Sequence, residues 1–322
     1  MYQSGSRLTF LLSIGVVRLQ RTRRVSVPRG IIPVRGRQSL MESTSKRARI
    51  EASGDPSTAS TSLGLDGLVV VNKPSGWTSF DVVAKIRGTL ERMIRAEGGA
   101  QIEAVKRSRR QKNKFLLKVG HGGTLDPAAT GVLVVGVGSA TKTMHHFLSG
   151  SKRYVTVAKF GEVTDTLDGE GQVVDTRDYK GVTREVVERA LVELTGDIQQ
   201  VPPAHSAIRK DGKRSYERAR AGEEVVMDPR TVTIHSIVLN RFEPPEIELE
   251  VECGGGTYIR SLIRDLAEKV GTVGYMKRLV RTKQGPLVLD GALEEADLSD
   301  PEKILLNLKK HEAYFQERSQ ES

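Results

Sequence analysis

The most reactive arrangement in the sequence is a glycine-rich loop that ends in a carboxylate. Residues 118–127 read KVGHGGTLDP and place Asp126 directly before a proline. The glycines let the backbone approach a ligand closely, and Pro127 disfavours a helical conformation at Asp126. An apolar stretch, 132–137, predicts a buried strand directly after the loop. Asp126 could therefore be a nucleophile on a rigid scaffold or a simple turn former, and the loop alone does not distinguish these roles.

Further segments occur with the order and spacing of a known enzyme family. They are NKPSGWTS at 72–79, KRY at 152–154, GEVTDTLD at 161–168, PPAHSAIRK at 202–210 and GTYIRSL at 256–262. Together with the loop at 120–127, they resemble the TruB family of tRNA pseudouridine-55 synthases over about residues 65–288. The resemblance implies an α+β fold, a pseudouridine synthase catalytic domain whose central mixed, mainly antiparallel sheet is flanked by helices. It also implies isomerisation of uridine to pseudouridine in RNA, most closely uridine 55 of the tRNA T-arm, with no cofactor and no metal.

The resemblance also implies the catalytic residues. Asp126 matches the family's nucleophile, which forms a covalent adduct while the glycosidic bond moves from N1 to C5 of uracil. Arg260 matches its ion-pair partner, and an opposite charge within about 4–6 Å favours the ionised carboxylate and offsets desolvation. Tyr154 matches the aromatic side chain that stacks on the extruded uracil. Attack on the base and attack on the sugar both remain open.

Five other residues match positions that bind substrate in the family: His121, Tyr258, Leu279, Lys73 and Asp168. His121 would replace the flipped base or support the altered RNA loop, since a uridine must leave its stack at a cost of a few kcal/mol. Tyr258 and Leu279 would line the uridine pocket, with core packing as the alternative. Asp168 lies in a turn, where it would contact RNA hydroxyl groups or cap the turn.

Basic stretches predict contacts with RNA phosphates. Residues 104–118 carry seven Lys or Arg and no acid, and 205–220 carry six against two acids. A third group comprises Lys277, Arg278, Arg281 and Lys283. A basic stretch is usually a solvated face, but these three bracket the expected site, so phosphate binding is the better interpretation. We expect RNA affinity to fall steeply with salt.

Elements that would position these residues follow from hydrophobic periodicity. Apolar, β-branched runs predict strands at 68–71, 132–137, 154–160, 173–174, 232–239 and 247–252. Helical spacing is found at 79–90, 183–195 and 257–270. Strands and helices do not alternate regularly, which favours an α+β fold with a mixed sheet.

The expected organisation has three parts. Residues 1–64 form a disordered basic region, 65–290 the catalytic domain with a basic insertion at 91–118, and 291–322 an acidic tail with one or two short surface helices. The tail from Asp290 carries nine acids against four bases and would be repelled by phosphate. The small C-terminal RNA-binding domain of most bacterial relatives looks absent. His205 also departs from the family, which usually has an aromatic residue there.

The N-terminal region suggests where the protein acts. Residues 1–40 hold eight arginines and no acid, which is typical of a mitochondrial presequence or of a basic tail. Residues 46–49 form a short basic cluster of the nuclear-import type, and a solvated linker is an equal alternative. Initiation at Met1 or Met41 would give mitochondrial and nuclear forms, with the cytoplasm left open. No apolar run approaches about 18 residues, so we expect no membrane span.

Two other functions fit parts of the sequence. A non-catalytic RNA chaperone would use the basic stretches without Asp126. A carboxylate glycosidase acting on a free nucleoside would need a second acid, which Asp165 or Asp168 could supply. The leading hypothesis is the isomerase, with tRNA and its T-arm stem-loop as partner, other RNA including mRNA as a wider class, and a monomeric state.

Overall fold

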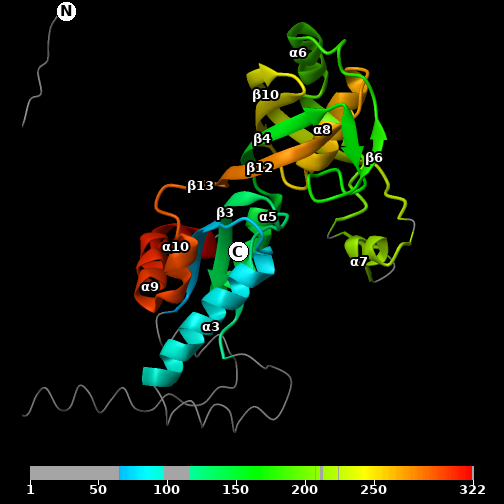
Figure 1. The fold of residues 1–322 in the computed structure, drawn as a ribbon. Helices are drawn as coiled ribbons and strands as arrows, with labels where there is room; N and C mark the ends of the chain where they lie inside the picture. Colours follow the sequence, from blue (N-terminus) through cyan, green and yellow to red (C-terminus); the bar gives the residue numbers. More distant parts are fainter. Residues whose placement is uncertain (1–64, 98–115, 207, 211–212, 224, 321–322) are drawn as a thin grey trace, which may run out of the picture. The chain divides into compact units, whose positions relative to one another are not determined.

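The computed structural model describes residues 65–97, 116–206, 208–210, 213–223 and 225–320 (Figure 1). The expected presequence, the basic cluster at 46–49 and most of the basic stretch at 104–118 lie outside these residues. No helix in the described ranges is long and apolar enough to cross a membrane.

A nine-stranded sheet forms the centre of the described fold (Figure 1). Its main order is β1 (Gly67–Lys73), β3 (Thr130–Val137), β12 (Gly274–Gln284), β4 (Lys152–Phe160), β11 (Glu246–Cys253), β10 (Arg230–Glu243) and β7 (Gly196–Gln200). The short strands β2 (Val119–His121) and β13 (Leu287–Val288) pair with β3 and β12. The β12–β3 pair is parallel and the other pairs of this sheet are antiparallel. The expected mixed, mainly antiparallel sheet is therefore confirmed.

The remaining elements surround this sheet or project from it. The helices are α3 (Ser79–Glu97), α5 (Met144–Ser149), α6 (Arg184–Glu193), α7 (Ser215–Arg220), α8 (Ile259–Lys269), α9 (Pro301–Lys310) and α10 (Glu312–Gln320), with 3-10 turns η1 (Gly138–Thr143) and η2 (Glu295–Ser299). Two small hairpins are β5 (Glu162–Thr164) with β6 (Val173–Thr176), and β8 (Arg209–Lys210) with β9 (Lys213–Arg214).

The core has two main parts that meet at β12. One cluster joins β4, β10, β11 and β12 to α6 and α8, and includes Leu125, Tyr154 and Leu279. The other joins β1 and β3 to α3 and the C-terminal helix α9. Strand β12 therefore connects the half of the sheet that carries the Asp126 loop to the half that carries Tyr154.

Strand β12 is absent from the strands that the sequence predicts, because two register shifts break its alternation of buried and exposed residues. The shifts against β4 lie between Met276 and Arg278 and between Arg281 and Lys283. Each extra residue interrupts the period-two alternation of a strand. The buried residues consequently occur at irregular steps, at Gly274, Met276, Leu279, Arg281 and Gln284.

Two expected boundaries differ from the structure. The helix expected at 79–90 continues to Glu97, and its additional turns extend the buried face with Ile94, four residues after Leu90. The buried Glu91 carboxylate accepts hydrogen bonds from the backbone N–H groups of Leu116 and Leu117. Residues 91–97 of the expected insertion are therefore part of α3.

The C-terminal segment is not a surface tail in its described part. Leu298, Ile304 and Leu308 are buried in the same cluster as β1. The Asn307 side chain accepts a hydrogen bond from the backbone N–H of Val70. The short helices expected after Asp290 are present, but α9 is packed into the core through a narrow apolar stripe, which a count of charges does not detect.

Candidate active site

The site is built around an ion pair between Asp126 and Arg260. Asp126 lies on the loop between β2 and β3, and Arg260 is the second residue of α8. The Arg260 Nη2 atom lies 2.9 Å from Asp126 Oδ1. The Arg260 side chain is only 6% exposed, whereas the Asp126 side chain is 27% exposed and so remains open to a ligand. The contact expected from the motif match is therefore present.

Arg260 is held by several acceptors besides Asp126. Nη2 also donates to the carbonyl of His205 at 2.9 Å, and Nη1 donates to the carbonyl of Thr166 at 3.1 Å. The Asp168 carboxylate lies 3.5 Å from Nη1. These contacts fix the guanidinium in place, so Arg260 presents a preorganised positive charge to Asp126.

Burial determines the proton affinity of Asp126. Desolvation raises the pKa of Asp126, the Arg260 charge opposes this change, and the nearby Asp168 adds to it; the net direction is upward. The sequence predicted that Arg260 would offset desolvation, and in the structure this offset is incomplete. A carboxylate with a raised pKa is a stronger base in its ionised form.

Lys73 supports the turn that follows Asp126. Its buried Nζ atom donates to the carbonyl oxygens of Pro74, Trp77 and Pro127, the last at 2.9 Å. Burial lowers the pKa of Lys73 to about 8, and the charge of Asp126 partly opposes this change. In the described structure Lys73 contacts the nucleophile's neighbour rather than the cleft, so its observed contacts are those of a support for the loop.

A second set of supports comes from β12, and the motif analysis did not identify it. Arg281 donates from Nε to the carbonyl of Val132 and from Nη2 to that of Gly123. Gln284 donates to the carbonyl of Gly122. Arg281 is 1% exposed, so its assignment to a phosphate-binding surface is wrong. Arg281 and the exposed Arg278 lie three residues apart on a continuous stretch of the β12–β4 ladder, so strand alternation places them on opposite faces.

Tyr154 lies in the interior next to this support. It is buried in the same cluster as Leu125 and Leu279, and it pairs directly with Arg281 across β4 and β12. Burial raises the pKa of Tyr154, and the nearby Arg281 side chain opposes this change. Leu125, in the same cluster, directly precedes Asp126, so Tyr154 packs beside the loop that carries the carboxylate.

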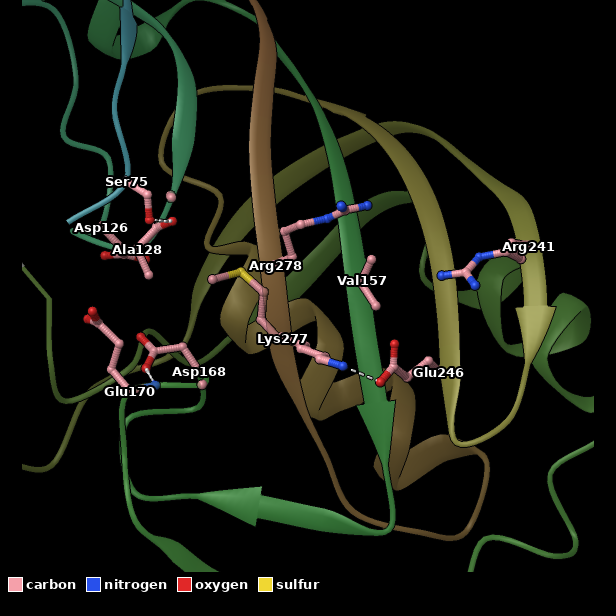
Figure 2. Close-up of a pocket in the computed structure, with 13 residues that line it drawn as sticks. Ser75, Asp126, Ala128, Val157, Asp168, Glu170, Arg241, Glu246, Lys277 and Arg278 are labelled. Atoms are coloured by element: carbon pink, nitrogen blue, oxygen red, sulfur yellow. Dashed lines mark hydrogen bonds and ion pairs between the residues drawn. The ribbon is translucent and has the colours of Figure 1, made fainter. Parts of the chain in front are cut away.

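A cleft of about 450 Å³ opens beside Asp126. Figure 2 shows Asp168 and Glu170 on the same side of it as Asp126, with Arg241 at the other end of the view. Ser75 and Ala128 line it next to Asp126, and Lys277 and Arg278 line its β12 side. The cleft therefore joins a carboxylate-rich catalytic end to a cationic end on the sheet.

The remaining expected site residues do not line the cleft beside Asp126. The His121 Nδ1 atom accepts a hydrogen bond from the Gly123 backbone at 3.3 Å, and Leu279 packs in the core. The Arg230 guanidinium lies 4.8 Å from the centre of the Tyr258 ring. His121, Leu279 and Tyr258 do not line the cleft as described. Asp165 accepts a hydrogen bond from Gln172 within its turn, so Asp168 is the acid that joins Asp126.

No group of three or more His, Cys, Asp or Glu within the described ranges has an arrangement that could hold a metal ion. The single cysteine, Cys253, is buried. The ionisable side chains that line the described cleft are carboxylates, including Asp126 and Asp168, and the cationic groups of Arg241, Lys277 and Arg278.

Comparison with known proteins identifies the family of this chain. The model described as "TruB family pseudouridylate synthase (N terminal domain)" matches residues 107–259. Pseudouridylate synthase TRUB1 of Mus musculus is 44% identical over 255 residues, which cover 78% of this chain and 73% of that protein. The tRNA pseudouridine synthase B of Arthrobacter sp. (strain FB24) is 41% identical over 247 residues, 75% of this chain and 73% of that protein. A solved Cbf5–Nop10–Gar1 complex contains a chain with a TM-score of 0.51 and 26% identity, covering 78% of this chain and 59% of that chain.

The fold and the carboxylate–guanidinium site are those of a pseudouridine synthase, an enzyme class that isomerises uridine in RNA. Within that class, the chain belongs to the TruB family of pseudouridylate synthases. The resemblance drawn from the motifs is thereby confirmed.

Proposed function

We propose that this enzyme converts uridine 55 in the T-arm of tRNA to pseudouridine by covalent catalysis from Asp126. The observation that carries the proposal is the 2.9 Å contact between Arg260 and Asp126 at the edge of an open cleft. The relatives named tRNA pseudouridine synthase B support tRNA as the substrate.

The proposed reaction balances without a cofactor. An ionised Asp126 oxygen forms a covalent bond to the nucleoside, and the N1–C1′ glycosidic bond breaks. The base turns, the C5–C1′ bond forms, and the bond to Asp126 breaks. The proton on C5 leaves and N1 gains a proton, so the product is an isomer of the substrate. Arg260 keeps Asp126 oriented, and Tyr154 provides an aromatic face and a hydroxyl near the reacting base.

RNA binding at the cationic end of the cleft is part of the proposal. Arg278, Lys277 and Arg241 each form an ion pair with a glutamate, namely Glu248, Glu246 and Glu243. An RNA phosphate that enters the cleft would replace these partly exposed carboxylates as the partner of the cationic side chains. Exposed ion pairs are worth about 0–1 kcal/mol, so the exchange costs little.

The wider biological context stays a proposal as well. We propose that other RNA, including mRNA, is a second substrate class, that the enzyme acts as a monomer, and that starts at Met1 and Met41 send it to the mitochondrion and the nucleus. N-terminal peptide mapping from the two compartments tests the start sites. Recovery of a single N-terminus would refute the two-form hypothesis.

Tritium release from tRNA transcripts tests the central proposal. Uridine tritiated at C5 loses its label only when C5 becomes the glycosidic carbon. The wild type should release tritium from a transcript with uridine at position 55 and should release none from that position when it carries cytidine. Asp126→Asn should bind tRNA and release no tritium. Release by Asp126→Asn would refute the nucleophile, whereas free uracil among the products would indicate a glycosidase.

A further inference from the structure

Arg281 occupies a position that ordinarily belongs to an apolar residue. It is one of the largest fully buried side chains among the described residues, and it lies in the middle of β12. Its backbone pairs with Gly131 of β3 on one side and with Tyr154 of β4 on the other. A Cβ atom on Gly131 would lie 2.2 Å from the Arg281 carbonyl oxygen, so the two strands are in very close contact here.

The guanidinium of Arg281 contacts both halves of the catalytic machinery. It donates to the carbonyl of Val132 at 2.7 Å and to that of Gly123 at 3.1 Å. Gly123 lies three residues before Asp126, and Val132 lies just inside the strand that follows the loop. Arg281 is also the cross-strand neighbour of Tyr154, and its charge opposes the rise that burial causes in the pKa of Tyr154. Arg281 is therefore a single group between the loop of Asp126 and the ring of Tyr154.

This buried charge has no carboxylate partner within salt-bridge distance in the described part of the chain. Two buried lysines beside it, Lys73 and Lys152, are likewise bound to carbonyl oxygens, and the Arg281 charge lowers the pKa of each. A buried charge that is not paired is costly. Stability alone gives no reason to keep an arginine at this position, since a well-packed apolar residue could occupy the space.

We propose that Arg281 is a positioning residue, which sets the distance and orientation between the Asp126 carboxylate and the Tyr154 hydroxyl. The inference rests on the proposed reaction at Asp126. Because displacement of a reacting group by about 1 Å can cost about 100-fold in rate, an arginine that is hydrogen-bonded to the loop and to β3, and that lies directly across from Tyr154, would act on the chemical step. Its burial removes it from direct contact with RNA phosphates.

The test compares single-turnover tritium release with RNA affinity in Arg281→Met and Arg281→Lys. The Met variant should lose about 100-fold in the single-turnover rate, while the dissociation constant for tRNA and its salt dependence stay within about twofold of wild type. The Lys variant should lie between, because an ammonium group keeps the charge but lacks the planar fork that reaches two carbonyls. Ile304→Ala, in the other core cluster, is the control: it lowers stability and should leave the rate unchanged.

A second measurement does not depend on turnover. The phenol titration of Tyr154 is obtained as the difference spectrum between each protein and its Tyr154→Phe counterpart. Removal of the Arg281 charge should move this titration to higher pH, and the Lys variant should move it less.

Four outcomes would overturn the proposal. The first is a folded Arg281→Met variant with the wild-type rate, and the second is a loss of tRNA affinity in that variant as large as its loss of rate, with a shallower salt dependence. The third is a rate loss in Ile304→Ala equal to that in Arg281→Met. The fourth is an unchanged Tyr154 titration in either Arg281 variant. An inactive wild type whose Tyr154 titration still responds to Arg281 would instead reject the reaction proposed for Asp126.

Discussion

A single nitrogen of Arg260, Nη2, donates to the Asp126 carboxylate at 2.9 Å and to the backbone carbonyl of His205 at the same distance. The nucleophile and the segment that begins at His205 therefore share one donor. Because the other nitrogen, Nη1, contacts Thr166 and Asp168, the guanidinium has little freedom to reorient. This arrangement leads to the first prediction.

The pH dependence of kcat/KM should report the ionisation of Asp126. Activity requires the ionised carboxylate, so it should fall as pH falls through the raised pKa of Asp126. Arg260→Gln removes a positive charge that lowers this pKa and should move the acidic limb to higher pH. Asp168→Asn removes a negative charge that raises it and should move the limb to lower pH. Arg260→Gln should also lose about 100- to 1,000-fold in kcat.

The two variants are controls for each other, because both alter the contacts of one guanidinium and their charge changes are opposite. Stopped-flow or quench-flow measurements between about pH 5 and 8 give the acidic limb of the pH profile for each variant. Shifts in the same direction for both variants would contradict the electrostatic account.

Lys73 should contribute a pH dependence to stability. Its pKa is about 8 in the folded protein against 10.5 for an ordinary lysine, so between these values the unfolded chain binds more protons. The free energy of unfolding from this group therefore rises with pH across that window. Urea unfolding of wild type and Lys73→Met at several pH values isolates the effect as a difference. An identical slope in the two proteins would show that Lys73 titrates normally.

Gly131 should tolerate no side chain. It has φ of +106°, and an added Cβ would meet the backbone of Arg281. Gly131→Ala should cost about 3 kcal/mol or more through strain and overpacking. Gly181→Ala is the matched control, because nothing lies within 4 Å of its added Cβ and its φ is not in the left-handed region. Equal melting temperatures for the two variants would contradict the close contact between β3 and β12.

The helix α9 should be required for stability of the catalytic domain. Ile304→Ala removes a fully buried side chain from the β1 cluster and should cost about 2–5 kcal/mol. Leu306→Ala, on the same helix, removes a side chain that is 70% exposed and should change stability by less than about 0.5 kcal/mol. Thermal melting measures the stability of both variants. Equal losses of stability would mean that α9 does not pack as described.

The cationic end of the cleft should control the salt dependence of RNA binding. Arg278→Gln should reduce the slope of log affinity against log salt by about one if Arg278 binds one phosphate. Glu248→Gln removes the carboxylate that lies 3.1 Å from Arg278 and should strengthen binding at low salt. Filter binding over a salt series measures both. No change in slope for Arg278→Gln would remove this residue from the RNA interface.

Local patterns in the sequence determined most strands of the sheet, because strand alternation and helical periodicity each extend over only a few neighbouring residues. The role of the loop at Asp126 and the residues of the ion pair followed from the resemblance to the family. The pairing of Asp126 with Arg260 was also expected, although 134 positions separate them, since the motifs occur together in one family.

Only the tertiary structure decided the roles of β12 and α9. The register shift between Arg281 and Lys283 places Arg281 and Gln284 on the same buried face of β12 although they are three residues apart, and no local pattern reveals where a strand gains an extra residue. The same holds for α9, because the net acidic charge of the segment after Asp290 gives no indication that Ile304 and Leu308 are buried in the core. Charge, hydropathy and spacing are properties of neighbouring residues, whereas burial of a charge depends on which distant carbonyl groups surround it.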